Sequence, residues 1–345
     1  MGRRFSQWIL VLGALALAAG CLVHTAVNRQ DRVSEKELFA MDTVMRLTAY
    51  GSRSREAVEA AAAEIQRLDA LLSVSSASGE TARLNSTGGG PVSEDTGRLL
   101  TAALELYRET GGLFDCTVYP LMELWGFPTK AYHVPTEQEL AAALPLADMS
   151  RVQFDGQTLT MAEGQRIDFG GIAKGYAAQR AMEIFQSCGV KSGMVYLGGN
   201  IQVLGTKPDG TDWRIGIQDP EGESGAVMAV LPVRDKAVVT SGGYERYFVE
   251  DGKTYIHILD PRTGCPAESD LLSVTVIAED GTLADALSTS LFIMGREGAA
   301  EYWRESGGAF DMVLVVKDQP LYVTEGVSVS LETETDVKVI TADGS

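Results

Sequence analysis

The sequence has few of the residues that build disulfide frameworks, zinc sites or nucleic-acid-binding surfaces. It contains four cysteines and three histidines in 345 residues. Cys116, Cys188 and Cys265 are widely scattered, which is not the spacing of a disulfide framework or of a zinc site. The basic residues form no long run, and the formal net charge is −18. This balance argues against nucleic acid as a partner and against electrostatic binding to anionic lipids.

The apolar run Trp8–Ala19 is too short for an ordinary transmembrane helix. It follows two arginines, as the apolar part of a secretory signal does. It ends in Leu-Ala-Ala-Gly-Cys at Cys21, which resembles a bacterial lipoprotein cleavage box. We therefore predict a signal peptide over residues 1–20, lipidation of Cys21 and a polar tether over 21–38. The alternative is an ordinary secretory signal in which Cys21 is incidental.

The remainder, residues 39–345, is predicted to be one α+β domain of one or two lobes, with mixed or antiparallel sheets and flanking helices. Helical periodicity and capping residues predict helices over 55–72, 94–110, 136–144, 174–185, 283–293 and 297–306. Short, often alternating segments between turn residues predict strands over 44–50, 194–197, 202–204, 213–218, 227–233, 237–240, 244–249, 254–259, 271–278 and 309–316. The segment 73–85 is predicted to be a loop, and 113–127 an irregular aromatic segment that walls a planar ligand or packs in the core.

The helix predicted over 283–293 has Thr282 as its expected N-cap and Gly295 as its expected stop. Asp285, Ser288 and Thr289 stand at i, i+3 and i+4, so their oxygens share one face. A carboxylate and two hydroxyls are ligands suited to Mg²⁺ or Ca²⁺. The same residues also suit a purely structural role, in which Asp285 completes a capping box and the hydroxyls bond to the preceding turn.

A second candidate site lies at Asp168-Phe-Gly-Gly171-Ile-Ala-Lys174, where a strand end is followed by a glycine turn and a helix start. Glycines allow the backbone to approach a ligand closely, and a helix N-terminus favours anions. Lys174 on the first turn is placed to meet a phosphate. The glycine spacing is neither that of a P-loop nor that of a dinucleotide-binding fingerprint.

Short motifs follow one another in a single order across residues 41–315. They are Met41-Asp-Thr, Leu72-Ser, Arg83-Leu-Asn, Phe114-Asp-x-Thr-Val-x-Pro-Leu-x-x-Leu-Trp-Gly-Phe, Asp168-Phe-Gly-Gly-Ile-Ala-Lys-Gly-Tyr-Ala, Leu197-Gly-Gly-Asn, Thr240-Ser-Gly-x-Tyr, His257-Ile-x-Asp-Pro-x-Thr-Gly and Ala284-Asp-Ala-x-Ser-Thr. In this order they resemble the FAD:protein FMN transferase family, the ApbE-type lipoproteins.

The resemblance implies a Mg²⁺-dependent transfer outside the cytoplasm, on a protein anchored to the bacterial membrane through lipidated Cys21. FAD is the substrate, FMN is attached through its phosphate to a Thr or Ser hydroxyl of an acceptor protein, and AMP leaves. Two alternatives remain: a Mg²⁺-dependent FAD pyrophosphatase that yields FMN and AMP, and a non-catalytic, lipid-anchored FAD-binding protein. An intact Asp285/Thr289 pair argues against the last, because binding alone needs no metal on the diphosphate.

By similarity, Mg²⁺ is held by Asp285, Thr289, the Ser288 position and the backbone carbonyl of Gly171. The family often has Asp where Ser288 stands, so this ligand is weaker here or acts through water. The resemblance also implies a set of flavin contacts: Met41, Ser75, Leu113, Phe114, Asp115, Asp168, Lys174 and Leu259. The family frequently has an aromatic residue at the Ser75 position.

His257 is the candidate general base, positioned at the end of a predicted strand and just before Asp260-Pro261. An imidazole with an ordinary pKa would take the proton of the acceptor hydroxyl near neutral pH, and transfer would then change between pH 6 and 9. The alternative is a histidine bonded to its own loop.

Overall fold

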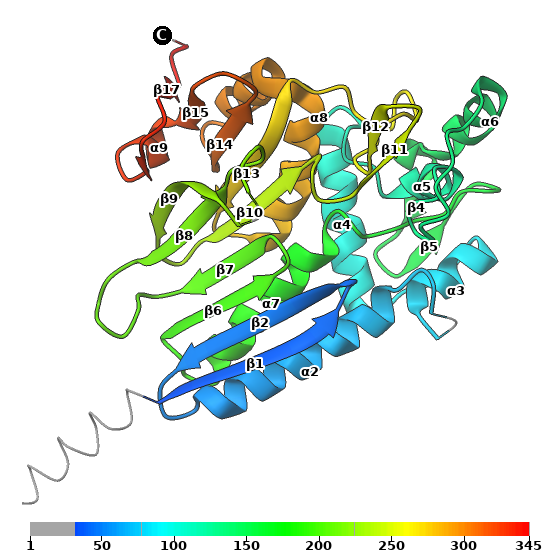
Figure 1. Ribbon diagram of the computed structural model, residues 1–345. Coiled ribbons are helices and arrows are strands. Elements are labelled where there is room, and N and C mark those ends of the chain that lie inside the picture. Colours follow the sequence, from blue (N-terminus) through cyan, green and yellow to red (C-terminus); the bar gives the residue numbers. More distant parts are fainter. Residues whose placement is uncertain (1–31, 77, 224, 345) are drawn as a thin grey trace, which may run out of the picture.

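The computed structural model describes residues 32–344 except 77 and 224, so the predicted signal peptide and Cys21 lie outside the described residues. A nine-stranded sheet, in the order β1-β2-β6-β7-β10-β13-β14-β15-β17, forms the centre of the fold (Figure 1). All neighbouring pairs are antiparallel except β15 with β17. The strands are β1 Val33–Ala40, β2 Thr43–Tyr50, β6 Ser192–Leu197, β7 Asn200–Leu204, β10 Ala237–Gly242, β13 Leu271–Ala278, β14 Asp311–Val316, β15 Leu321–Thr324 and β17 Val337–Ile340.

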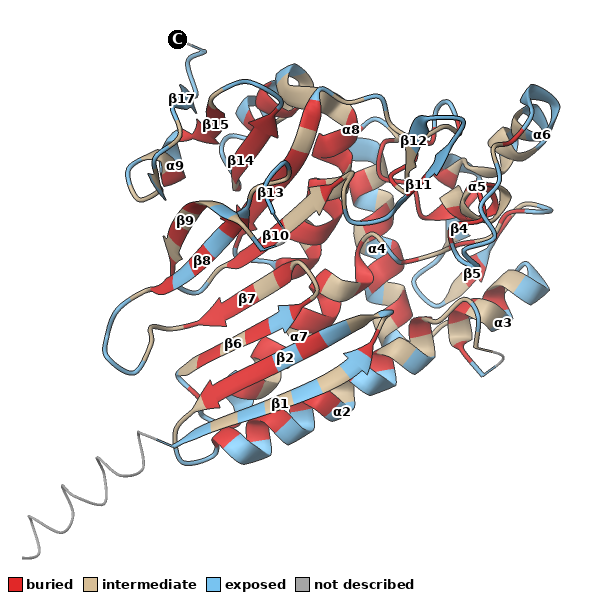
Figure 2. Ribbon diagram, in the orientation of Figure 1, coloured by how far each residue is buried: buried red, intermediate tan, exposed pale blue. Residues whose placement is uncertain are grey.

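Helices cover one face of this sheet and a small second sheet covers part of the other (Figures 1 and 2). The covering helices are α2 Ser54–Leu72, α7 Ala173–Ser187 and α8 Gly281–Glu305, and the second sheet is formed by β8 Trp213–Gln218, β9 Val227–Val233 and β16 Glu332–Thr333. Successive residues of the central strands pack into different cores: Val238 lies in the cluster beneath the small sheet, and Val239 lies in the cluster beneath the helices. Strands buried on both faces need such continuous apolar runs. The predicted α+β class is therefore confirmed.

Most of the remaining elements form a smaller region beside the sheet (Figure 1). They are α3 Glu80–Thr87, β3 Gly89–Pro91, α4 Glu94–Glu109, α5 Tyr119–Leu124, α6 Glu137–Ala143, β4 Gln153–Phe154, β5 Thr158–Thr160, β11 Tyr247–Glu250 and β12 Lys253–Ile256. The short helix α9 Glu325–Ser328 contacts β14, β15 and β17 near the C-terminus. In the part of the chain that is described, no helix combines the length and apolarity needed to cross a membrane.

The tether predicted over residues 21–38 extends too far, because its last residues belong to a strand. Residues 33–40 form β1, an edge strand that pairs along its whole length with β2. The charged residues that suggested a tether alternate with half-buried ones along this strand, as expected where one face of an edge strand contacts α2. Any tether must therefore end before Val33.

Two local predictions also need correction. The segment predicted to be a loop over 73–85 contains most of α3, which ends at Gly88 in a left-handed conformation. The irregular segment 113–127 contains a 3-10 turn, Cys116–Val118, and the short helix α5. Asp115 caps that turn by accepting from the Thr117 N–H at 2.7 Å, a side-chain contact that periodicity does not reveal.

Helix α8 begins two residues earlier than predicted and contains both helices predicted over 283–293 and 297–306. Its N-cap is Asp280, whose Oδ1 accepts from the backbone N–H of Thr282 (2.7 Å) and of Leu283 (3.2 Å), so Thr282 is not the cap. Gly295 has φ 74° and ψ 177°, which breaks the helical path as predicted. The chain then resumes helical conformation to Glu305, so the expected stop is a kink between two helical parts.

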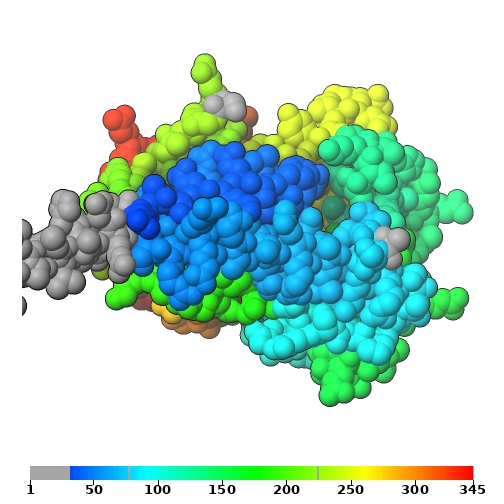
Figure 3. All heavy atoms as spheres, turned by 90° about the horizontal axis from the view of Figure 1, so that it is seen from below, coloured from blue at the N-terminus to red at the C-terminus, as the bar shows by residue number. Residues whose placement is uncertain are grey.

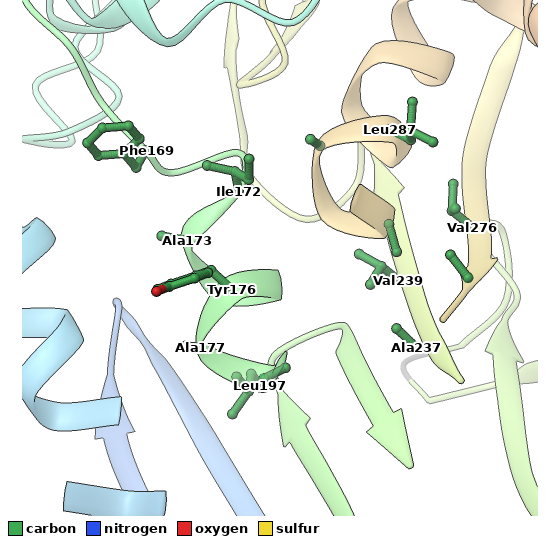
Figure 4. Close-up of a cluster of buried hydrophobic side chains, with 14 of the residues drawn as sticks. Phe169, Ile172, Ala173, Tyr176, Ala177, Leu197, Ala237, Val239, Val276 and Leu287 are labelled. Carbon is green, nitrogen blue, oxygen red and sulfur yellow. The ribbon is translucent and has the colours of Figure 1, made fainter. Parts of the chain in front are cut away.

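Helices α7 and α8 are in close backbone contact at Gly175. A Cβ atom at this position would lie 2.1 Å from the Gly281 carbonyl oxygen and 2.6 Å from the Asp285 Cβ. Figure 4 shows the apolar side chains of this region, with Ile172 and Tyr176 of the α7 segment on one side and Leu287 of α8 beside Val276 on the other. Only glycine allows this crossing, which sets where α8 lies relative to the start of α7.

Replacing Gly175 with alanine is therefore expected to destabilise the fold, because backbone must move to admit the methyl group. We expect a loss of about 1–3 kcal/mol, seen as a lower thermal midpoint. Gly97→Ala is the matched control. It lies inside α4, where the new Cβ would be 3.4 Å from the nearest side-chain atom, an ordinary contact. That variant should be neutral or slightly stabilised by helix propensity. Equal midpoints for the two variants would contradict the crossing argument.

Candidate active site

Most of the predicted site residues gather at one end of the nine-stranded sheet. Because the strands alternate in direction, the β1–β2 turn, the β6–β7 turn and the C-terminal end of β10 lie at the same end. Helix α7 starts beside this end. Seen from below, the surface is hollowed where the blue β1–β2 hairpin, the light-blue α2–α3 region, the green α5 region and the yellow β11–β12 hairpin meet (Figure 3).

The β1–β2 turn carries Met41, a predicted flavin contact. Met41 (φ 47°) and Asp42 (φ 61°) both have left-handed backbone conformations. A two-residue hairpin turn of type I′ requires a positive φ at both of its central residues. Neither is glycine, so the turn stores strain that the surroundings must hold. The Met41 N–H donates to Asp69 Oδ1 at 2.9 Å, and the Asp42 carboxylate pairs with Arg246 at 3.1 Å. The turn is thus held from α2 on one side and from the β10–β11 segment on the other.

The predicted metal ligands on α8 face the start of α7. Asp285 is buried, and its Oδ2 accepts from the Gly175 N–H at 2.8 Å. Within the described residues, no hydrogen bond engages its other carboxylate oxygen. Thr289 is half-buried, and its Oγ1 lies 4.0 Å from where a Cβ of Gly171 would stand. The structure thus brings Asp285, Thr289 and the Gly171 backbone together, although Gly171 is more than a hundred residues away in sequence.

Ser288 has a different environment. Its fully buried hydroxyl donates to the Asp285 carbonyl oxygen at 2.8 Å and contacts the Ser241 hydroxyl at 2.7 Å. These contacts tie α8 to the end of β10 and position the Asp285 backbone. The predicted ligand role of Ser288 remains a prediction, and the structure gives this residue a positioning role.

The donor set fits a hard divalent cation that is completed by its substrate. It offers one carboxylate oxygen, one hydroxyl and one backbone carbonyl, which are oxygen ligands of the kind Mg²⁺ prefers. Among residues 32–344 as described, no three His, Cys, Asp or Glu side chains form a ready-made metal cage. A Mg²⁺ ion usually keeps one or two protein carboxylates and takes its remaining ligands from water and substrate phosphates. The site has that composition.

Two cations, Lys174 and Arg246, stand among the carboxylates of the site. Burial raises the pKa of Asp168, and the charges of Lys174 and Arg246 oppose that rise. Asp168 also accepts from the Gly170 N–H at 2.9 Å, which orients its carboxylate across the glycine turn. In the described structure Lys174 has no carboxylate within ion-pair distance, so its ammonium group is free to meet an anionic ligand.

Glu245 is a site residue that the sequence motifs did not include. Solvent reaches its side chain, yet the surrounding protein raises its pKa to about 7; the neighbouring charge of Asp285 adds to the rise, and the charges of Lys174 and Arg246 oppose it. The Glu245 Oε1 is 3.4 Å from where a Cβ of Gly199 would stand, which places it over the β6–β7 turn.

A cation at Asp285 would favour ionised Glu245, so metal binding should release a proton near neutral pH. We expect Mg²⁺ affinity to rise by up to about tenfold from pH 6 to pH 8, because Glu245 loses its proton across this range. Calorimetry in buffers of different ionisation enthalpy measures both the affinity and the proton release. Glu245→Gln should remove the pH dependence, whereas Glu105→Gln on the exposed face of α4 should keep it. A pH-independent affinity in the unaltered chain would contradict the coupling.

The segment 113–115 forms a wall of the same site. Phe114 is buried, and its ring edge lies 3.4 Å from where a Cβ of Gly171 would stand. Leu113 and Asp115 are buried beside it. The Asp115 carboxylate accepts from Thr117 and, at 3.1 Å, from the Met149 N–H, so its oxygens are used within the protein. A flavin contact by Asp115 would have to come from its backbone.

The other two predicted flavin contacts, Leu259 and Ser75, lie in different segments of the structure. Leu259 is buried in the aromatic cluster that includes Trp125 and Phe248. Ser75 is exposed in the α2–α3 loop, where its N–H and hydroxyl both contact the Ser73 hydroxyl at 3.3 Å. Whether these residues touch flavin stays a prediction.

His257 follows β12 and is held by Arg246. The Arg246 carbonyl oxygen accepts from the His257 backbone N–H at 3.0 Å and lies 3.1 Å from Nδ1. A carbonyl oxygen only accepts, so Nδ1 carries the proton and Nε2 of the neutral ring is left as the acceptor. Burial, together with the charges of Arg246 and Lys174, lowers the pKa of His257 to about 4. The half-buried ring is thus bonded to its own hairpin and also presents a basic nitrogen.

Sequence reasoning missed Glu245 and Arg246. The nearest quoted motif ends at Tyr244, and nothing in the local pattern distinguishes the two charges that follow from an ordinary solvated pair. Their significance appears only when Arg246 meets Asp42, about two hundred residues away, at the β1–β2 turn.

Three comparisons place these features among known proteins. The sequence profile of the ApbE family matches residues 41–314. Proteins named FAD:protein FMN transferase from Treponema pallidum and Vibrio cholerae are each 33% identical, aligned over 83% and 84% of this chain and 85% and 88% of their own lengths. The crystal structure of an ApbE protein from Thermotoga maritima matches with a TM-score of 0.80 at 35% identity, over 87% of this chain and 99% of that one. The flavin transferase ApbE from Vibrio cholerae matches with a TM-score of 0.76 at 28% identity, over 85% and 98%.

Proposed function

The chain belongs to the ApbE family, and from this premise we propose that it is a Mg²⁺-dependent FAD:protein FMN transferase. It takes FAD, joins the FMN phosphate to a Thr or Ser hydroxyl of an acceptor protein, and releases AMP. The observation that carries the proposal is the meeting of Asp285, Thr289 and the Gly171 backbone with Lys174, Asp168 and His257 at one end of the sheet. Oxygen ligands, a free ammonium group and a basic nitrogen are what phosphoryl transfer to a hydroxyl requires.

The residues divide the work by their chemistry. A Mg²⁺ ion held by Asp285, Thr289 and the Gly171 carbonyl would neutralise diphosphate charge and orient the phosphates. Lys174 meets a phosphate oxygen, and the wall formed by Phe114 packs against the isoalloxazine end of FAD. Asp168 and the Gly170–Gly171 turn keep the backbone close to the substrate.

His257 Nε2 accepts the proton of the acceptor hydroxyl as that oxygen bonds to the FMN phosphorus. The bridging P–O bond breaks, and its oxygen leaves with AMP. The Arg246 carbonyl keeps the His257 ring oriented through Nδ1. The two phosphates stay within reach of Lys174, which balances charge on the leaving side.

The test uses the full chain in detergent with FAD, Mg²⁺ and a candidate acceptor domain that exposes a Thr or Ser. We expect a flavin-fluorescent acceptor band on a denaturing gel, and no band in EDTA. Soluble FMN and AMP without a labelled acceptor, across a panel of acceptor domains, would favour the pyrophosphatase alternative. Intact FAD throughout would favour the binding protein.

We also propose that the chain works outside the cytoplasm and is attached to the membrane through a lipid on Cys21. This rests on the sequence before residue 32 alone. Replacing Cys21 with serine is expected to move the chain from the membrane fraction to the soluble extracytoplasmic fraction, measured by fractionation of expressing bacteria. Cys188→Ser, a buried cysteine in the domain, is the control and should stay in the membrane fraction. Equal membrane retention of both variants would contradict lipidation at Cys21.

A further inference from the structure

Two hairpins at the edge of the hollow expose large apolar side chains. Phe39 and Val44 pair across β1 and β2 and are 67% and 59% exposed. Tyr247 and Val249 stand two residues apart on the same face of β11 and are 51% and 59% exposed. We call these four residues the rim patch. Single exposed apolar residues are ordinary, but a group of them beside a catalytic hollow indicates an interaction surface.

Aromatic contacts fix the orientation of the β11–β12 half of the rim patch. Phe248, between Tyr247 and Val249, is buried and stacks on Tyr132 (4.8 Å between centroids) and on Tyr255 (5.1 Å). Since side chains alternate along a strand, the anchored Phe248 ring forces its two neighbours to face away from the aromatic cluster. The β11–β12 hairpin therefore cannot turn to bury them without losing both stacks.

The two halves of the rim patch are joined beside the catalytic histidine. The Asp42–Arg246 ion pair at 3.1 Å links the turn next to Phe39 and Val44 with the residue before Tyr247. Tyr247 is the cross-strand partner of Ile256, and His257 is the next residue. Figure 3 shows that the blue β1–β2 hairpin and the yellow β11–β12 hairpin both border the hollow. A protein hydroxyl that reaches His257 brings its neighbouring residues over this rim.

We infer that the rim patch is the docking surface for the acceptor protein, which contacts it through apolar side chains flanking the target hydroxyl. This inference rests on the proposed function. Exposed aromatic side chains that need little ordering are the usual anchors of such contacts. Four side chains are few beside the roughly 20–30 residues per partner of a stable interface. A contact of this size suits a substrate that must leave after each turnover.

Charge supports an apolar contact over an electrostatic one. The chain carries a formal charge of −18, so long-range attraction would act only on basic acceptors. The Asp42 and Arg246 charges neutralise each other within the rim. Acceptor binding should therefore depend weakly on salt concentration.

The test compares the Phe39→Ser/Tyr247→Ser double variant with the unaltered full chain, using the acceptor domain that the unaltered chain labels. Val329→Ser is the control, because Val329 is 92% exposed in the segment after α9. We expect KM for the acceptor to rise by at least about tenfold in the double variant, with KM for FAD and FAD-induced fluorescence quenching unchanged. The control should match the unaltered chain, and the thermal midpoints of all three should agree.

Three results would overturn the inference. An acceptor KM within twofold of the unaltered value would show that the acceptor docks elsewhere. A parallel rise in the KM values for FAD and for the acceptor would assign the rim patch to the flavin site. Loss of a dimer on size-exclusion chromatography, with acceptor KM unchanged, would identify a second copy of the chain as the occupant. If the unaltered chain binds FAD but labels no acceptor, the proposed function fails and the docking surface fails with it.

Discussion

Replacing Asp285 with asparagine is expected to lower flavin transfer by at least about a hundredfold. Asparagine keeps the shape of the side chain, and its carbonyl oxygen can still accept from the Gly175 N–H that Asp285 Oδ2 now engages at 2.8 Å. The substitution therefore removes the negative charge while leaving the α7–α8 contact in place. Asp285 is the only carboxylate in the predicted ligand set, so the divalent cation should bind far more weakly to the Asp285→Asn variant.

Two readouts separate a lost metal site from a damaged fold. In the unaltered chain, Mg²⁺ added together with FAD should raise the thermal midpoint, because a ligand that binds only the folded state stabilises it. In Asp285→Asn the midpoint without ligands should be near the unaltered value, and Mg²⁺ should raise it little.

Asp280→Ala is the matched control, five residues earlier on the same helix. Asp280 caps α8 through the N–H groups of Thr282 and Leu283. Its loss should cost about 1 kcal/mol of stability and leave transfer close to normal. Normal Mg²⁺-dependent transfer by Asp285→Asn would show that the metal is held elsewhere.

The second large effect concerns His257. Replacing it with glutamine should reduce transfer to the acceptor by about 10²- to 10⁴-fold, since the acceptor hydroxyl would lose its general base. FAD binding, measured by quenching of flavin fluorescence, should change little. If the His257→Gln variant transfers FMN at the normal rate, the ring serves only to close its own hairpin, which was the structural alternative.

The pH dependence expected for His257 differs from the one that its residue type suggests. An ordinary imidazole would lose activity as the pH falls from 7 to 6. Burial and the nearby cations lower the pKa of His257 to about 4, so the ring is neutral and basic throughout pH 6–9. A general base acts when deprotonated, and its contribution to kcat/KM should therefore fall only as the pH drops towards 4.

Glu245 offers a different source of pH dependence near neutrality, because its pKa is raised to about 7. The pH profile of kcat/KM should be recorded for the unaltered chain and for Glu245→Gln. We expect any inflection near pH 7 to disappear in Glu245→Gln. An inflection near pH 6.5 that survives in this variant would mean that His257 titrates close to its ordinary value.

The sequence by itself determined the local chemistry of the predicted metal site. Helical spacing placed Asp285 and Thr289 on one face of α8, because a helix returns to the same side every three to four residues. Turn residues and apolar runs predicted most of the central strands, because a strand that is buried on both faces carries apolar residues along most of its length. The order of the motifs determined the family, which the match over residues 41–314 confirms.

Capping and strand pairing were decided by contacts that periodicity does not contain. Asp280 caps α8 because its carboxylate reaches two backbone N–H groups, although Thr282 had the expected spacing. Residues 33–38 resemble a charged tether, yet they pair with β2 because β2 and α2 offer them a sheet edge and a surface.

Only the tertiary structure decided how the site works. The crossing at Gly175 fixes Asp285 beside the start of α7, and the antiparallel order of the sheet brings Asp42 to Arg246. Burial, a property of the whole fold, moves the pKa of His257 down and that of Glu245 up. Residue types and spacings state which groups can bind a metal or accept a proton. Their distances, exposure and shared charges depend on segments far apart in the chain, and no local pattern records them.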